Sequence, residues 1–437
     1  MLAAAIMLAT AASSTQAEDL LEMYQKAIQQ DARLAIGLSD YEAALQARPN
    51  AKSALMPQLS ASGRYEHHDQ TYDDIPAARA NLYKDGTYNS KNFSVSMDQT
   101  LYDRRQWKAL SQASDVIDQA TAEKFASEQD LIMRLSGAYF EVLAAADSLK
   151  FTRMEKQATA HQADEMRRRF EAGLATQVDV KESAAQLSLA AAQEIDATYQ
   201  LSVEKENLRV ITGETPGMLR NLKANLKLQA LESSMDDWTR LALKNSPQVK
   251  SAKAALSHAQ KEVDRRRAGY LPTVGLSAEY ANTVDDGGFS EGKDTDTSVG
   301  IEVKLPIFDG GKTRSEVREA RALLKKAERQ YQLAVRETMR ETRAAYLNTR
   351  AAVNRMNALE EALVATEAAY EASRTGMQIG TRTVLEVLSG LRESLRAKKD
   401  YNRARYDYVL SLLRLKQAAG ELAIEDIQKV NSWLQDF

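Results

Sequence analysis

Two hydrophobic patterns alternate along the chain. Residues 57–66 and 91–102, and again residues 272–280 and 297–308, place apolar side chains at about every second position. A period of two is typical of a strand that has one apolar and one polar face. The pattern therefore predicts four short strands, arranged as two strand–loop–strand pairs.

Long stretches with helical periodicity follow each strand pair. From Arg104 to about Phe170 the chain contains no Pro and a single Gly, which predicts a continuous helix of about 67 residues, or roughly 100 Å. Two adjacent stripes indicate that this helix packs against neighbours on two sides, as in a ring of helices. The first stripe has heptad spacing and consists of Leu131, Leu135, Ala138, Val142, Ala145 and Leu149; the second consists of Ile132, Tyr139, Leu143 and Ala146.

The second half of the chain repeats the order of the first. Each half is predicted to run helix, strand, loop, strand, long helix, turn and helix. This internal similarity predicts a tandem duplication, with a first repeat over 18–223 and a second over 224–437. The turns between the two helices of each repeat are expected at about 171–178 and 375–382.

The four predicted strands cannot form a closed barrel by themselves. An apolar-out, polar-in alternation over about ten residues is typical of outer-membrane barrel strands, but the smallest bacterial barrels have about eight strands. Open sheet edges are not tolerated in lipid. We therefore expect several protomers to contribute strands to one barrel. The alternative is a small soluble sheet packed on the helices.

Composition excludes several classes of protein. The 437 residues include only 7 Pro and 6% aromatics, as expected for long helices. The net charge of −3 gives no basic footprint for nucleic acid. The absence of Cys excludes disulfides, zinc–thiolate sites and a thiol nucleophile. No catalytic triad or phosphate-binding loop is present, and His67–His68 and the acidic loop after residue 284 are weak metal candidates, so we expect no enzyme activity, no cofactor and no metal site.

The N-terminal segment is typical of a secretory signal. Residues 1–17 are apolar and end in small residues at the usual cleavage spacing. We expect the mature protein to start at Glu18; the alternative is a short N-terminal helix. No later run approaches the ~20 apolar residues of a membrane-spanning helix. The sequence thus predicts an exported protein without a helical membrane anchor.

Four motifs resemble those of a known family. They are "RFEAGLATQVDV" at 169–180, "GTRTVLEVL" at 380–388, and the helix ends "LRVITGE" at 208–214 and "LKQAAGEL" at 415–422. With the duplicated strand–loop–strand–helix plan, they resemble the TolC family of outer-membrane efflux channels. The resemblance implies a mainly α protein with a small β part. Each protomer would form part of a long coiled-coil α-helical barrel in the periplasm and give four strands to a trimeric twelve-stranded outer-membrane β-barrel.

The same resemblance implies that the two turns are the periplasmic tips of each protomer. In the family these tips close the entrance and dock a periplasmic adaptor protein. Gly173 and Gly380 fit turns that need a positive φ or a close backbone approach. The alternative is an ordinary C-cap between two helices. The residues implied at the adaptor-docking tips are Gly173, Leu174, Ala175, Ile379, Gly380 and Thr381.

The resemblance also places a gate at the periplasmic entrance. Asp179 and Arg382 would join in the network that holds the inner helices shut, because a carboxylate and a guanidinium can form a bidentate pair. Met377 stands in this gate where the best-studied member of the family has a Tyr, and Val178 stands where it has a Thr. Each difference removes a hydroxyl group from the network.

One acidic residue is implied at the pore constriction. Glu386 matches one of two pore-lining acids of the family, and Ser389 stands in place of the other. Three copies would therefore form one ring of carboxylates, which favours cations. The alternative for Glu386 is an ordinary solvated acid on a helix.

These inferences converge on an exit duct in the outer membrane of a Gram-negative bacterium, with a long periplasmic extension. The implied partners are two further copies of the chain, a periplasmic adaptor, an inner-membrane ABC or RND-type transporter and outer-membrane lipid, but no nucleic acid. We favour type I protein secretion. Multidrug or metal efflux is the alternative within the family, and a secreted coiled-coil structural or adhesive protein without a pore is the alternative of another class.

Overall fold

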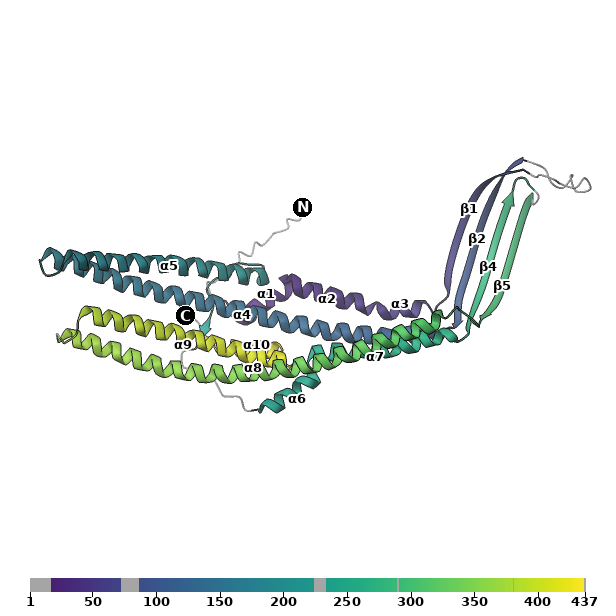
Figure 1. Ribbon diagram of the computed structural model, residues 1–437. Coiled ribbons are helices and arrows are strands. Elements are labelled where there is room, and N and C mark those ends of the chain that lie inside the picture. The colour runs from purple at the N-terminus through teal and green to yellow at the C-terminus, as the bar shows by residue number, and fades with distance from the viewer. Residues whose placement is uncertain (1–16, 72–85, 224–232, 289–290, 380, 436–437) are drawn as a thin grey trace, which may run out of the picture. The chain divides into compact units, whose positions relative to one another are not determined.

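The computed structural model describes residues 17–71, 86–223, 233–288, 291–379 and 381–435 (Figure 1). All but the last residue of the predicted signal segment lie outside these ranges. The chain forms two compact units. The first combines Met1–Leu38, Glu123–Val249 and Ala334–Phe437, and the second combines Ser39–Ala122 and Lys250–Leu333. Both sequence halves contribute to each unit, so the predicted repeats are not the compact units of the fold.

The first half of the chain contains five helices and three strands among its described residues. In chain order these are α1 (Leu20–Gln30), α2 (Ala32–Leu45), α3 (Ala47–Ser53), β1 (Gln58–Gln70), β2 (Gly86–Tyr102), α4 (Arg104–Glu171), α5 (Gln177–Thr212) and β3 (Asn221–Leu222). The 68-residue α4 is a single unbroken helix, because nothing in it interrupts the backbone hydrogen bonding.

The second half follows a similar order, with two helices and a 3-10 turn before its first strand and an additional helix before its last strand. Its described elements are α6 (Met235–Asn245), α7 (Pro247–Arg267), a 3-10 turn (Ala268–Tyr270), β4 (Thr273–Asp285), β5 (Gly292–Lys304), α8 (Lys312–Gln378), α9 (Val384–Ala418), α10 (Ile424–Asn431) and β6 (Leu434–Gln435). The 67-residue α8 is the counterpart of α4. Among the described residues, no helix is sufficiently long and apolar to span a membrane.

The second unit contains an antiparallel four-stranded sheet in the order β1–β2–β4–β5. The pairing of β2 with β4 joins the two hairpins, one from each half of the chain. The strands β1 and β5 are the two edges. One row of facing residues is apolar and consists of Leu59, Met97, Ala278 and Val299; the next row is polar and consists of Ser60, Ser96, Glu279 and Ser298.

The two faces of this sheet differ in chemistry. On the polar face the hydroxyl groups of Ser60 and Ser96 lie 2.8 Å apart. On the apolar face Val299 is 73% exposed and Ile301 is 68% exposed. The described part of the chain therefore leaves the apolar face open, which argues against the alternative of a soluble sheet packed on the helices.

The core of the first unit lies around the middle of α4. Both predicted stripes of α4 contribute to it, through Leu131 and Leu135 of one and Ile132 and Tyr139 of the other. Further fully buried side chains come from α1, α5, α9 and α10: Leu20, Met23, Leu208, Tyr406, Val409, Leu413 and Ile427. Helix α4 thus packs against neighbours on two sides, as its sequence predicts.

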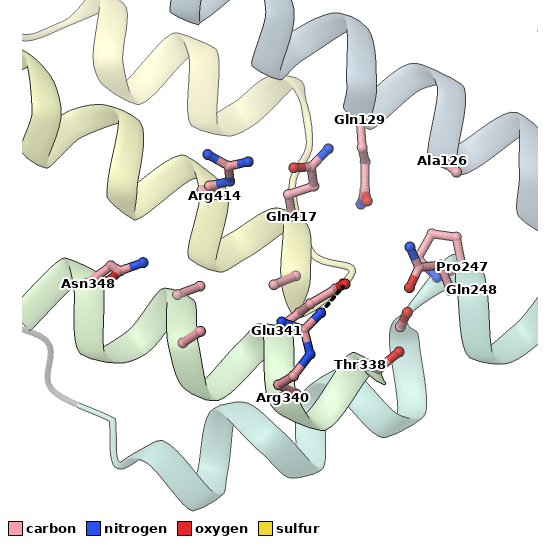
Figure 2. A pocket seen from close by; sticks show the side chains of 14 residues that line it. Ala126, Gln129, Pro247, Gln248, Thr338, Arg340, Glu341, Asn348, Arg414 and Gln417 are labelled. Carbon is pink, nitrogen blue, oxygen red and sulfur yellow. Dashed lines mark hydrogen bonds and ion pairs between the residues drawn. The ribbon is translucent and has the colours of Figure 1, made fainter. Parts of the chain in front are cut away.

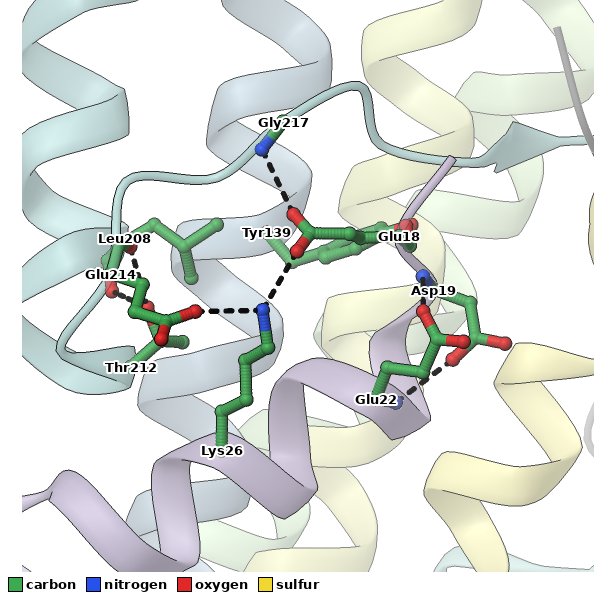
Figure 3. Close-up of polar contacts among 9 residues, drawn as sticks. All are labelled: Glu18, Asp19, Glu22, Lys26, Tyr139, Leu208, Thr212, Glu214 and Gly217. Carbon is green, nitrogen blue, oxygen red and sulfur yellow. Dashed lines mark hydrogen bonds and ion pairs between the residues drawn. The ribbon is translucent and has the colours of Figure 1, made fainter. Parts of the chain in front are cut away.

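Polar contacts attach the start of α1 to the loop that follows α5 (Figure 3). The backbone N–H of Glu18 donates to the carbonyl oxygen of Met218 at 2.7 Å, and the N–H of Gly217 donates to the Glu18 carboxylate at 2.9 Å. Lys26 Nζ bridges the carboxylates of Glu18 and Glu214 at 2.8 and 3.0 Å. These contacts hold the first described residues against the core.

Candidate functional site

The first tip is a five-residue turn between α4 and α5. Gly173 has φ +74°, and a Cβ there would meet nothing within 4 Å, so of the two reasons predicted for this glycine the positive φ applies and the close approach does not. The N–H of Leu174 donates to the carbonyl of Arg169 at 2.7 Å, and the N–H of Gly173 donates to that of Phe170 at 2.9 Å. This pair of hydrogen bonds is a Schellman motif, which satisfies the last carbonyl groups of α4.

A capping box starts α5 immediately after this turn. The Thr176 hydroxyl accepts from the N–H of Asp179 at 3.3 Å, and the Asp179 carboxylate accepts from the N–H of Thr176 at 2.8 Å. The two residues thereby satisfy two of the free N–H groups at the helix start. The family resemblance implies a gate role for Asp179. Among the described residues, its hydrogen bonds are to Thr176.

The second tip, between α8 and α9, has a similar construction. The N–H of Thr381 donates to the carbonyl of Gly376 at 2.9 Å. The Thr383 hydroxyl accepts from the N–H of Glu386 at 3.3 Å, and the Glu386 carboxylate accepts from the N–H of Thr383 at 2.7 Å. Gly380, the predicted counterpart of Gly173, lies outside the described residues.

Asp179 and Glu386 hold equivalent positions in the two tips. Each is the third residue of its helix and closes a capping box with a threonine. The family resemblance implies separate roles for them, one in the gate and one at the pore constriction. Their equivalence is visible in the sequence as the spacing of Thr176 from Asp179 and of Thr383 from Glu386. A Ser or Thr followed three residues later by an acid is typical of a helix start.

Arg382 distinguishes the second tip from the first. Its guanidinium lies 2.8 Å from the Glu386 carboxylate, whereas the equivalent position of the first tip is Ala175. A Cβ on Gly376 would lie 2.8 Å from Cγ of Arg382, so the absence of a side chain there makes room for the arginine. Within the described residues the structure pairs Arg382 with Glu386 and brings neither into contact with Asp179.

These hydrogen bonds lower the pKa of both capping acids. The N–H of Thr383 and the Arg382 guanidinium lower the pKa of Glu386 to about 2. The N–H of Thr176 lowers the pKa of Asp179 in the same way. A carboxyl group whose pKa is lowered by folding gives stability that is complete above its unfolded pKa and is lost as the pH falls through the folded value.

Replacing Thr383 by Ala should loosen the start of α9. The substitution removes the hydroxyl that accepts from Glu386, which typically costs about 1 kcal/mol of helix stability. We expect faster hydrogen exchange at the backbone amides of residues 384–388. Wild-type protein should lose the same protection only as the pH falls toward 2, after correction for intrinsic exchange rates.

Thr375→Ala is the matched control for this experiment. The Thr375 hydroxyl donates to the carbonyl of Glu371 within α8 and caps no helix. Its removal should leave exchange at 384–388 unchanged. Equal acceleration by both substitutions would contradict a specific capping role for Thr383.

Apolar side chains project from both tips. Leu174 is 79% exposed and Ile379 is 72% exposed. Met377, predicted in the gate, is also exposed at the end of α8. Leu174 and Ala175 line a groove beside the first tip with Leu385 of α9, and the remaining lining residues are Gln162, Met166, Arg169, Asp179, Glu182, Ser183 and Gln186.

The open apolar sheet face and the paired long helices with capped tips define the class of protein. This is the fold of an outer-membrane channel whose helices extend the duct beyond the membrane. The chain belongs to the outer membrane efflux protein family, whose model matches residues 23–214 and 238–421. The two matched stretches fall in the two predicted repeats. The protein is accordingly an outer-membrane channel of the TolC family.

Individual relatives support this assignment. Outer membrane protein TolC of Vibrio cholerae is 32% identical over 98% of this chain and 96% of its own. The alkaline protease secretion protein AprF of Pseudomonas aeruginosa is 28% identical over 94% of this chain and 86% of its own. The Campylobacter jejuni CmeC outer membrane channel has the same fold, with a TM-score of 0.78, 16% identity, and coverage of 95% of this chain and 90% of that one. Channels of this family form trimers and work with periplasmic adaptors and inner-membrane transporters.

Proposed function

We propose that three copies of this chain form the outer-membrane exit duct of a tripartite export system. The observation that carries the proposal is the sheet with one open apolar face and two free edges. Four strands per copy and three copies give 4 × 3 = 12 strands, and closing them into a barrel leaves no edge exposed to lipid. The proposal also includes the secretory signal at residues 1–17 and the two repeats at residues 18–223 and 224–437.

The tips are proposed as the periplasmic entrance and the adaptor-docking surface. Their exposed apolar residues Leu174 and Ile379 and the groove beside Ala175 offer a surface to a partner helix. Glu386 and Arg382 form an exposed ion pair. The two residues are four positions apart in the same tip, so this pair joins no two helices; because exposed pairs are weak, Arg382 remains able to bind a carboxylate of another helix in a gate. Among the described residues each is bonded within its own tip, so a contact of Arg382 with Asp179 would require either movement of the two tips or a neighbouring copy.

Protein secretion is the favoured cargo assignment. It is supported by AprF, which is named for protease secretion and matches this chain along nearly its whole length. Multidrug or metal efflux remains the second candidate, since the family model describes an efflux protein. Members of the family are channels rather than enzymes, and we propose that this chain likewise has no catalytic activity. A deletion strain would decide between the cargoes, by loss of secreted proteins or by increased sensitivity to toxic small molecules.

Single-channel current through the purified protein in a planar bilayer tests the duct and the gate. We expect a small conductance for the wild type and a severalfold larger one for Arg382→Ala, because the substitution removes the guanidinium that the family resemblance implies in the network that holds the entrance shut. Arg374→Ala is the matched control, since Arg374 pairs with Glu371 three residues away in α8. Absence of current from folded protein would contradict the duct. A current unchanged by Arg382→Ala would contradict the gate alone.

A further inference from the structure

A polar pocket lies in the first unit and includes no residue of the tips (Figure 2). It is formed where α6 ends and α7 begins, and α4, α8 and α9 supply its other walls. Three of its polar lining residues are buried: Thr338 is 2% exposed, Ser246 is 4% exposed and Gln129 is 7% exposed. Nothing in the proposed duct uses this pocket.

The hydroxyl of Thr338 is the first indication of a ligand. Oγ1 is buried and has no hydrogen-bond partner within the described part of the chain. Threonines inside helices usually donate to the carbonyl four residues earlier, as Thr342 and Thr349 of the same helix do at 2.8 and 2.9 Å. Thr338 lines the pocket without making this bond. A buried hydroxyl without a partner costs free energy, which a group inside the pocket would recover.

The charges around the pocket favour an anion. Pro247 and Gln248 form the first turn of the 21-residue α7, whose N-terminus carries free N–H groups and a positive partial charge. Arg414 has no ion-pair partner in the described ranges, whereas Arg340 is paired with Glu341 at 3.2 Å. Glu341 is the only carboxylate in the lining. A metal cation would find too few ligands, because the described residues contain no cluster of three or more His, Cys, Asp or Glu.

We propose that this pocket binds a small oxyanion of the phosphate, sulfate or carboxylate class at the N-terminus of α7. Thr338 donates its hydroxyl proton, Arg414 supplies the compensating charge, and the first turn of α7 supplies N–H donors. The oxyanion comes either from solution or from the carboxylate of a neighbouring copy. The second source rests on the proposed trimer; the first does not.

Thermal unfolding and titration calorimetry of the purified full-length protein in detergent test the site. The probe is inorganic phosphate, compared with sodium chloride at equal ionic strength. Phosphate should raise the unfolding temperature of the wild type. Arg414→Gln and Thr338→Val should each weaken phosphate binding about tenfold or more, since each removes a hydrogen bond to a charged group. Thr338→Val should still fold, because it removes a hydroxyl that has no partner in the empty pocket.

Arg343→Gln is the matched control. Arg343 lies on the same helix, about half a turn around from the pocket-lining face, and its replacement makes the same change of charge. It should bind phosphate like the wild type. A second pattern would identify the oxyanion as a carboxylate of a neighbouring copy. In that pattern phosphate has no effect, Arg414→Gln and Thr338→Val lower the trimer-dissociation temperature, and Arg343→Gln does not. If neither pattern is found, or if all three variants behave alike, the proposal is wrong.

Discussion

Replacing Val299 by Arg is expected to abolish insertion into the outer membrane. Val299 lies on the apolar face of β5, 73% exposed, in one row with Leu59, Met97 and Ala278. A lipid-facing arginine near the middle of the bilayer costs about 2–4 kcal/mol, so three copies cost roughly 6–12 kcal/mol. Outer-membrane fractionation and the yield of heat-labile trimer on electrophoresis measure the effect.

Ser298→Arg is the control for this substitution. Ser298 is the adjacent residue of the same strand and lies on the polar face, in the row that contains Ser60, Ser96 and Glu279. An arginine there would face the water-filled interior of the proposed barrel, and the variant should insert and assemble normally. If both variants insert equally well, the apolar face does not meet lipid. If both fail, the strand is sensitive to any arginine and the assignment of faces is unsupported.

Replacing Gly420 by Ala is expected to destabilise the first unit by about 2–5 kcal/mol. Gly420 ends α9 with φ +72°, a conformation that residues with a Cβ rarely adopt. A Cβ would also lie 2.6 Å from the backbone carbonyl atoms of Asn245 and 2.7 Å from the backbone nitrogen of Ser246. Because the obstacle is backbone, no side-chain movement relieves it. The unfolding temperature in detergent and the yield of trimer should both fall.

Gly137→Ala should have the opposite effect. Gly137 lies inside α4, and a Cβ there would meet nothing within 4 Å. Alanine is more favourable than glycine in a helix by about 1 kcal/mol, so this variant should unfold at the same or a higher temperature. If Gly137→Ala lost as much stability as Gly420→Ala, the positive φ and the close approach at Gly420 would not be the cause of the destabilisation.

Local patterns were sufficient to predict most of the elements. The predicted helix from Arg104 to about Phe170 differs from α4 by a single residue at its end. The prediction is accurate because Pro and Gly disrupt a helix through its own backbone, and this stretch has no Pro and a single Gly. The four strands also occur where the alternation predicts them, but β5 ends at Lys304 and not at residue 308. The strands also extend beyond the predicted ranges at their other ends, β1 to Gln70, β4 to Asp285, and β2 and β5 from Gly86 and Gly292. These extensions are largely polar, so they carry no alternating pattern to extend the prediction.

Features that depend on contacts distant in sequence could not be predicted. The register of β2 against β4 joins residues from the two halves of the chain, and β3 and β6 are two-residue strands that pair across nearly half of the sequence. The pocket beside Thr338 is of the same kind. The sequence does not distinguish Thr338 from Thr342. Only the packing of four other helices decides that the Thr342 hydroxyl is bonded and the Thr338 hydroxyl is not.

The tips are an intermediate case. The capping boxes at Thr176 and Thr383 are local motifs and could have been recognised from the sequence. Their recognition would have shown that Asp179 and Glu386 occupy equivalent positions before any role in a gate was considered. The difference between the tips, which is the Arg382 that pairs with Glu386, is equally visible in the sequence once the two turns are aligned.

The arrangement of the sheet also determines how copies can assemble. Its two edges are different strands, β1 and β5. A β1–β1 or β5–β5 contact would either invert one copy across the membrane or turn its apolar face away from lipid, so copies in one barrel join head-to-tail. A pair of copies joined in this way still exposes one β1 edge and one β5 edge, the same number as a single copy. Only ring closure removes both edges at once, and an even number of strands per copy keeps every junction antiparallel. Assembly should therefore be cooperative, with monomers and complete rings present and dimers scarce.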